Sequence, residues 1–373
     1  MPTHQFGAPA ATSQQSSAVA WHTRVLLAVL VIAVALSAAV ALSPSPLVAA
    51  ATTKAHHRTR YYVSLGDSYA VGYQPGKGAT PGFTVYVAEH THDRLVNFAC
   101  SGATTTSIID TVGCPDPLPH TDGGVAYPTT TQAAAAESFI AAHRRRVALI
   151  TVSIGGNDVT ACAVAPNPIS CVTTAVATIA KNVTTLALAL RTAAGPGVPL
   201  IGLTYPDVIL GDYVYPTRPP TPARLSLAKL SVVAFRSLIN PTLQHAYAQA
   251  QGSFVNVTAA TGGYGPLTRT VRLPHGRVLP VPVARVCTLT WFCANGNIHA
   301  TTAGYRLIGK LILGRLRHLG KEQRHMAHLL APGAALLARR PPYASHPRTR
   351  RPGARRRGTI VASVPAGAHQ PSS

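Results

Sequence analysis

The feature that most constrains the fold of this chain is an alternation of short apolar runs with longer helical patterns between residues 60 and 320. The apolar runs have the length of β-strands. Several are apolar on both faces, which is typical of parallel strands buried between two layers. The predicted strands are YYVSLG (61–66), RLVNFAC (94–100), RVALITVSIG (146–155), VPLIGLTY (198–205) and SFVNVT (253–258).

Long segments with helical periodicity separate or follow these runs. The alternation predicts an α/β fold, a three-layer sandwich with a mostly parallel central sheet flanked by helices. Two segments rich in Pro and Gly, 206–222 and 260–296, are expected to be loops beside the sheet. The predicted helices cover residues 130–146, 170–194, 223–250 and 301–319.

The beginning of the chain has the composition of an export signal. Arg24 precedes the apolar run VLLAVLVIAVALSAAVAL, and no further charged residue occurs before Lys54. Prolines and small alanines then provide a cleavage site near 49–51. We predict that residues 1–51 are a signal peptide, with an uncleaved N-terminal anchor as the alternative because the run is long. Either version places the remaining chain outside the cytoplasm, secreted or held at the cell surface.

The end of the chain is strongly basic. The formal net charge is +22, and many arginines lie near the C-terminus, where no acidic residue follows Glu322. Residues 321–373 are predicted to be a disordered Pro- and Arg-rich tail. The tail is either a solvated end or a segment attracted to an anionic cell-wall polymer or membrane surface. Nucleic acid is not expected as a partner, because the chain is exported and lacks interleaved aromatic residues.

Six cysteines and no C-x-x-C pair argue for disulfides rather than a zinc site in an exported protein. Their clustering favours local pairs that fix loops, with free buried thiols as the alternative. No metal is expected. The predicted pairs are Cys100–Cys114, Cys162–Cys171 and Cys287–Cys293.

Four candidate functional residues lie next to the ends of predicted elements. Ser68, Gly102 and Asn157 each follow a predicted strand, and His299 precedes the last predicted helix. In a sheet of this type, ligands bind at the carboxyl ends of the strands. The fold can therefore bring these four residues together although they are far apart in the sequence.

The sequence blocks around these residues resemble those of the GDSL, or SGNH, hydrolase family. The blocks are GDSY-x-x-G at 66–72, ACSGATT, GGND at 155–158 and a late histidine. The resemblance covers residues 60–320, which we expect to form an SGNH-type hydrolase domain. Within the family, the sequence most resembles secreted actinobacterial esterases and lipases.

The resemblance implies a role for each residue. Ser68 is expected to be the nucleophile and His299 the general base. The backbone N–H groups of Ser68 and Gly102 and the side-chain amide of Asn157 are expected to form an oxyanion hole. No cofactor is implied. Each residue also has an ordinary structural alternative: a helix cap for Ser68, and turn positions for Gly102 and Asn157.

One position departs from the family pattern. The family carries an aspartate three residues before the histidine, where this chain has Gly296. No Asp or Glu occurs between Asp212 and Glu322. We take the backbone carbonyl of Gly296 as the candidate that orients His299, with the side-chain amide oxygen of Asn295 or Asn297 as the alternative. Asp67 and Asp158 are expected to brace their own loops.

The function expected from these observations is that of a secreted, monomeric serine esterase or lipase. It would hydrolyse carboxylic esters, small-molecule or lipid, through an acyl-enzyme on Ser68. The alternatives are a carbohydrate deacetylase on the same fold and a catalytically weak binding protein held at the surface.

Overall fold

The computed structural model describes residues 58–115 and 123–338. The predicted leader lies outside the described residues, as does the part of the predicted tail beyond 338. Their structure and the roles predicted for them stay predictions.

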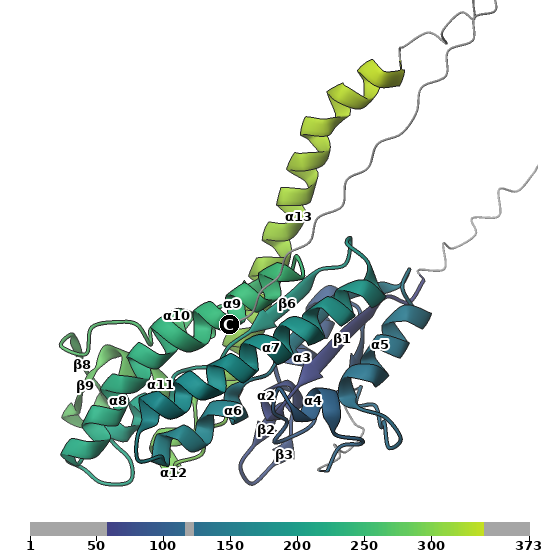
Figure 1. The fold of residues 1–373 in the computed structure, drawn as a ribbon. Coiled ribbons are helices and arrows are strands. Elements are labelled where there is room, and N and C mark those ends of the chain that lie inside the picture. The colour runs from purple at the N-terminus through teal and green to yellow at the C-terminus, as the bar shows by residue number, and fades with distance from the viewer. Residues whose placement is uncertain (1–57, 116–122, 339–373) are drawn as a thin grey trace, which may run out of the picture. The chain divides into compact units, whose positions relative to one another are not determined.

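The centre of the domain is a five-stranded parallel sheet with the strand order β4-β1-β5-β6-β7 (Figure 1). This order has a switch point between β1 and β5, where the chain turns from building one half of the sheet to building the other. The prediction of a parallel α/β sheet is confirmed. The strands are β1 (Tyr61–Gly66), β4 (Arg94–Asn97), β5 (Val147–Ser153), β6 (Leu200–Leu203) and β7 (Ser253–Val255).

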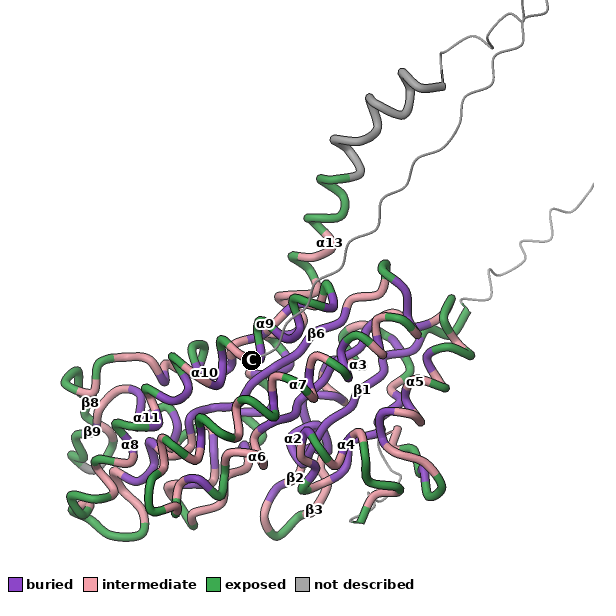
Figure 2. Tube along the Cα trace, in the orientation of Figure 1, coloured by how far each residue is buried: buried purple, intermediate pink, exposed green. Residues whose placement is uncertain are grey.

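The strands are buried on both faces because alternate side chains enter two different hydrophobic cores. In β1, Val63 and Leu65 join one core while Tyr62 joins the other. In β5, Ile150 joins the first and Leu149 the second. Figure 2 accordingly shows β1 and β6 as buried almost throughout. This double burial explains why these segments are apolar without alternation.

Helices cover the two faces and so complete the three predicted layers. Helices α5 (Gln132–Ala142), α7 (Pro168–Ala194) and α9 (Asn240–Gln249) pack on the first core, with α7 between the other two (Figure 1). Helices α3 (Phe83–Thr91) and α13 (Thr302–Ala338) pack on the second. Helix α7 is long and apolar enough to cross a membrane by length and composition, but its buried stripe belongs to the first core.

The helix predicted at 223–250 is interrupted. It consists of α8 (Pro222–Ala234), a π-helical turn η3 (Phe235–Ile239) and α9. Pro241 lies at the start of α9. Proline has no backbone N–H, and its ring clashes with the carbonyl four residues earlier, so the helix widens just before it.

The prediction of a loop at 260–296 is wrong in part, because the segment contains strands and helices. A hairpin of β8 (Thr270–Arg272) and β9 (Val278–Pro280) is followed by the helix α11 (Val281–Leu289). Their apolar residues form a third, small core together with Leu210. Helix α3 was also missed, since its β-branched and aromatic residues favour strands.

The last helix is longer than predicted. It was expected to end at 319, but α13 continues to Ala338 (Figure 1). The tail boundary at 320 is therefore too early, because strong helix formers continue past it through the sequence KEQRHMAHLLA. Residues 321–338 are helical and were wrongly assigned to the disordered tail.

Three disulfides join the predicted local pairs. The Cα atoms of each pair lie 5.1–5.6 Å apart, within the usual range for such bridges. Each bridge closes a short loop, so its main effect is to hold that loop in place.

We expect peptide mapping of the mature protein without reductant to recover these three pairs. The reason is that each pair already has bridging geometry in the folded chain. The measurement is mass spectrometry of a non-reduced digest, with the reduced digest as its control. A peptide linking Cys100 to Cys287, or free thiols at full stoichiometry, would contradict the pairing.

Candidate active site

The first sequence block forms a sharp turn at the carboxyl end of β1. Gly66 has φ +138°, and a Cβ atom at this position would lie 2.1 Å from the carbonyl oxygen of Ser153. Only glycine fits there. Asp67 then caps the short helix α2 (Ser68–Val71) by accepting the N–H of Tyr69. Ser68 is thus the first residue of this helix, beside the switch point of the sheet.

The side chain of Ser68 meets the late histidine, 231 residues away in the sequence. The Oγ atom of Ser68 lies 2.8 Å from Nε2 of His299. On the other side of the ring, Nδ1 lies 2.7 Å from Oδ1 of Asn297. The structure therefore joins a hydroxyl, an imidazole and an amide into one chain of hydrogen bonds.

The hydrogen bonds of Asn297 determine the tautomer of His299. The Oδ1 atom also accepts the backbone N–H of His299 at 3.0 Å, and that N–H can only donate. The atom facing Nδ1 is therefore an acceptor, so Nδ1 carries the proton. This leaves the lone pair of Nε2 free to accept the hydroxyl proton of Ser68.

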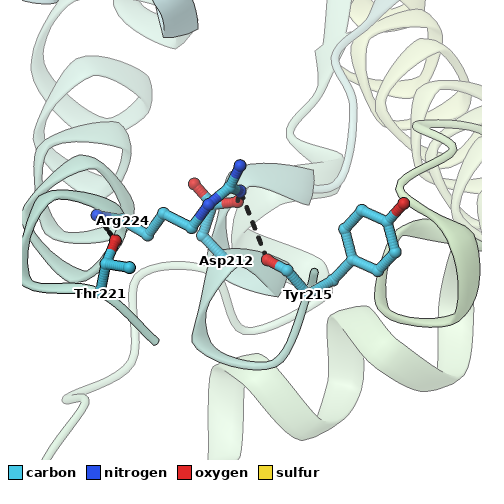
Figure 3. Close-up of polar contacts among 4 residues, drawn as sticks. All are labelled: Asp212, Tyr215, Thr221 and Arg224. Carbon is cyan, nitrogen blue, oxygen red and sulfur yellow. Dashed lines mark hydrogen bonds and ion pairs between the residues drawn. The ribbon is translucent and has the colours of Figure 1, made fainter. Parts of the chain in front are cut away.

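The prediction that the Gly296 carbonyl orients His299 is wrong, and the alternative, Asn297, holds the ring. Gly296 instead ends a short helix with φ +74°. A Cβ atom there would lie 2.5 Å from the ring of Tyr215. Tyr215 is itself held in place. The guanidinium of Arg224 donates to the carbonyl of Tyr215 and to the carboxylate of Asp212 (Figure 3). An aspartate at 296 would need strained backbone and a displaced Tyr215.

Within the described residues, no carboxylate hydrogen-bonds to His299. The acids that follow the predicted strands are all engaged elsewhere. The partner of Nδ1 is therefore the neutral amide of Asn297 and not a carboxylate. Asp67 bonds Tyr205 and Tyr69, Asp158 bonds Thr105, Asp207 bonds Ser231, and Asp212 bonds Arg224.

Aromatic residues hold the segment that carries His299, and sequence reasoning missed their role. The hydroxyl of Tyr69, the residue after Ser68, donates to the carbonyl of Ile298 at 2.6 Å. The ring of Tyr73 lies 4.5 Å from the imidazole, centroid to centroid. The backbone N–H of Trp291 donates to the carbonyl of His299 at 2.9 Å. The tyrosines of the GDSY-x-x-GY block were the available signal.

The predicted oxyanion-hole residues come together at the same end of the sheet. The Nδ2 atom of Asn157 donates to the carbonyl of Ala103 at 2.8 Å, which binds the Gly102 loop to the Asn157 loop. An amide nitrogen carries two protons, so one remains for a ligand. In the described part of the chain, the backbone N–H groups of Ser68 and Gly102 donate no hydrogen bond.

The two aspartates beside these residues brace loops, as predicted. Asp158 accepts the N–H of Thr105 at 2.9 Å and its hydroxyl at 2.5 Å, a second link to the Gly102 loop. Asp67, the residue before Ser68, accepts the hydroxyl of Tyr205 at 2.5 Å. Burial raises the pKa of Asp67 to about 7. Tyr205 has no sequence signal of its own.

Burial also changes the ionisation of the histidine. Desolvation lowers the pKa of His299 from 6.5 to about 4, because the charged imidazolium loses its hydration. Among the residues that the structure describes, no carboxylate bonds the ring to counteract this effect. The imidazole is therefore neutral, and able to accept a proton, down to mildly acidic pH.

An apolar cavity opens from this site. Its volume accessible to the centres of water-sized molecules is about 100 Å³. Ser68 and Asn157 lie in its wall, and most of the other lining residues are aliphatic or aromatic. Many of these come from α7, α8, η3 and the 3₁₀ helix η2 (Val208–Tyr213). The arrangement thus combines a hydroxyl, a neutral imidazole and amide donors with an apolar cavity.

The comparison with known proteins points to one family. The sequence profile of the GDSL-like lipase/acylhydrolase family matches residues 64–307. No curated protein matches the chain significantly.

Three solved structures resemble this one at low similarity. The lipase Lip_vut3 from a goat rumen metagenome is 16% identical, with TM-score 0.40, 69% of this chain covered and 97% of that one. A G-D-S-L family protein of Desulfitobacterium hafniense, described as lipolytic, is 11% identical, with TM-score 0.36 and coverages of 69% and 99%. A carbohydrate esterase is 11% identical, with TM-score 0.32 and coverages of 69% and 68%.

The family profile spans most of the described domain and includes all four sequence blocks, from Ser68 to His299. The chain belongs to the GDSL-like lipase/acylhydrolase family.

Proposed function

We propose that this acyl hydrolase is a serine esterase that cleaves carboxylic esters through an acyl-enzyme on Ser68. The observation that carries the proposal is the contact between Ser68 Oγ and His299 Nε2 at 2.8 Å, with Nδ1 held by Asn297. A serine hydroxyl is a weak nucleophile until a base within hydrogen-bond reach takes its proton.

In the first half of the reaction, Nε2 of His299 takes the proton of Ser68 while Oγ attacks the ester carbonyl carbon. The carbonyl oxygen becomes an oxyanion. The backbone N–H groups of Ser68 and Gly102 and the free N–H of Asn157 stabilise it by donating hydrogen bonds. The imidazolium then protonates the alkoxide, the carbon–oxygen bond breaks, and the alcohol leaves. Ser68 now carries the acyl group.

In the second half, water takes the place of the alcohol. His299 removes a proton from the water, and the resulting hydroxide attacks the acyl-enzyme. The same donors stabilise the second oxyanion. The imidazolium returns its proton to Ser68 Oγ as the carboxylic acid forms, so the enzyme is regenerated and one water is consumed for each ester cleaved.

Asn297 supplies orientation without charge. Its amide oxygen holds the proton on Nδ1 and keeps Nε2 facing Ser68, which is one part of what an aspartate does in a triad. It does not stabilise the imidazolium by charge. The low pKa of His299 is consistent with this environment, since burial disfavours the charged ring and no carboxylate of the described residues bonds it.

The proposal includes action outside the cytoplasm. The apolar leader is the reason to expect export, and the three disulfides fit an oxidising compartment. The arginine-rich end of the chain would then favour binding to an anionic cell-wall polymer or membrane surface.

Replacement of Ser68 or His299 by alanine is expected to lower kcat on p-nitrophenyl butyrate by on the order of 10⁴–10⁶, because the two residues act as a unit. For the same reason the double variant should be little worse than either single one. Thermal unfolding should show an intact fold in each case. Matched controls are Ser226→Ala and His245→Ala, both exposed and outside the site. Full activity in Ser68→Ala would refute the proposal.

The pH profile tests the role of Asn297. With the pKa of His299 near 4, kcat/KM should fall only as pH drops through about 4, where the base becomes protonated. In Asn297→Asp, a negative charge beside Nδ1 favours imidazolium, so the acid limb should move to higher pH.

The matched control is Asn295→Asp, which adds the same charge on the exposed residue that accepts the Asn297 backbone N–H. It should move the acid limb less. Equal shifts in the two variants, or no shift in Asn297→Asp, would show that Asn297 does not contact the ring in solution.

A further inference from the structure

We infer that the aromatic rings of Tyr73 and Tyr69 stabilise the imidazolium that His299 becomes during ester hydrolysis. The inference rests on the proposed function and adds two positioning residues to it, which act on the reaction through His299. The neutral amide of Asn297 orients the imidazole but supplies no charge. Stabilisation of the cation therefore comes from other neighbours of the ring.

A positive charge arises on the imidazole twice in each catalytic cycle. In the first half of the reaction Nε2 takes the proton of Ser68, and in the second half it takes a proton from water. The ring remains a cation until it passes that proton to the leaving alkoxide or back to Ser68. In a Ser-His-Asp triad an aspartate stabilises this cation. Here the hydrogen-bond partners of the ring are Ser68 and Asn297, and both are neutral.

Asp67 does not supply the missing negative charge, although it precedes Ser68. Its Oδ2 atom accepts the hydroxyl of Tyr205 at 2.5 Å, and its Oδ1 atom accepts the backbone N–H of Tyr69 at 2.9 Å. Burial raises the pKa of Asp67 to about 7, so this carboxyl is only partly ionised at neutral pH. Both of its oxygens are thus engaged with groups other than the imidazole.

Two tyrosine rings lie against the imidazole. The centroid of the Tyr73 ring is 4.5 Å from that of the imidazole, and the two planes are 55° apart. The ring of Tyr69 lies at 5.9 Å with planes 30° apart. A cation within about 6 Å of an aromatic centroid is attracted by the negative face of the ring. This attraction is strongest where water is excluded, and His299 is largely desolvated.

The ring of Tyr73 is held beside the imidazole before the reaction begins. The hydroxyl of the buried Tyr305 donates to the carbonyl of Tyr73 at 2.8 Å. The next residue, Gln74, is also buried and accepts the indole N–H of Trp291 at 3.4 Å. The backbone N–H of Trp291 donates in turn to the carbonyl of His299 at 2.9 Å. These bonds connect the turn that carries Tyr73 to the segment that carries His299.

Tyr73 is better suited to a test than Tyr69. Tyr69 lies in the wall of the apolar cavity and bonds the carbonyl of Ile298, so its replacement would change several features together. Tyr73 is not part of that wall. Within the described residues, the hydroxyl of Tyr73 forms no hydrogen bond. Tyr73→Phe therefore keeps the aromatic face, and Tyr73→Leu removes it.

The first test compares these two variants on p-nitrophenyl butyrate at neutral pH. Tyr73→Leu should lower kcat by about 3- to 30-fold, the range expected for a desolvated cation–π contact, whereas Tyr73→Phe should stay near the wild type. KM should change little, because both halves of the reaction pass through the imidazolium and slow alike. Equal kcat values in the two folded variants would overturn the inference.

A second series separates the electrons of the ring from its packing, and it also serves if Tyr73→Leu does not fold. Phenylalanines with one, two and three ring fluorines are introduced at position 73. Each fluorine withdraws electrons from the ring face and changes the ring volume little, so kcat should fall stepwise. Position 86 is the matched control, because Tyr86 stacks on His90 at 4.0 Å outside the site. A kcat that does not depend on fluorination at position 73 would overturn the inference.

Nitrogen-15 NMR of His299 tests the same contact without a substrate. In Tyr73→Leu the cation loses a stabilising neighbour, so the ring should titrate lower than in the wild type by about half to one and a half pH units. The same difference is expected in the Asn297→Asp background, where titration occurs at higher pH. The neutral ring should keep its proton on Nδ1, since Asn297 determines the tautomer.

A titration that does not move in Tyr73→Leu, or a proton that leaves Nδ1 in this variant, would overturn the inference. The second result would show that Tyr73 only fixes the orientation of the imidazole. If the wild type cleaves no ester, the proposed function itself fails, whereas the titration still decides whether the tyrosine rings favour the imidazolium.

Discussion

The hydrogen bond from Nδ1 of His299 to Oδ1 of Asn297 is the interaction on which the rest of the site depends. It decides which ring nitrogen carries a proton, and therefore whether Nε2 can accept the proton of Ser68. An acceptor is needed for this, but a charged one is not. The Oδ1 atom of Asn297 also accepts the backbone N–H of His299. This second hydrogen bond keeps the amide oxygen, rather than the amide nitrogen, facing Nδ1. Because the Asn297 amide is uncharged and His299 is largely buried, the neutral form of the imidazole is favoured.

The site is assembled from loops at the carboxyl ends of parallel strands, so its precision depends on how well those loops are held. Each disulfide lies in or beside one of them. The side chains of Asn157 and Asp158 then join two of the loops by bonding to Ala103 and Thr105. The hydroxyl of Tyr69 joins the turn that carries Ser68 to the segment that carries His299. The bridges are Cys100–Cys114 beside Gly102, Cys162–Cys171 after Asn157, and Cys287–Cys293 before His299.

Features with a strong local pattern were predictable from the sequence. The buried strands are continuous apolar runs, and their parallel arrangement places Ser68, Asn157 and His299 at one end of the sheet. The choice between Gly296 and Asn297 was not predictable, because it depends on the direction of one side chain within a tight turn. The helix α11 was missed because it lies in a Pro- and Gly-rich segment and packs on a small separate core. The shape of the cavity was not predictable either. It depends on how helices far apart in the sequence pack together, which the local sequence pattern does not specify.

The most direct test of this account is nitrogen-15 NMR of the His299 ring, assigned by the signals that disappear in His299→Ala. We expect a neutral ring protonated on Nδ1, which stays in that tautomer from neutral pH down to its titration near pH 4. We also expect this tautomer preference to be lost in Asn297→Ala. A ring protonated on Nε2, or one that titrates at or above its ordinary pKa of about 6.5, would contradict the account.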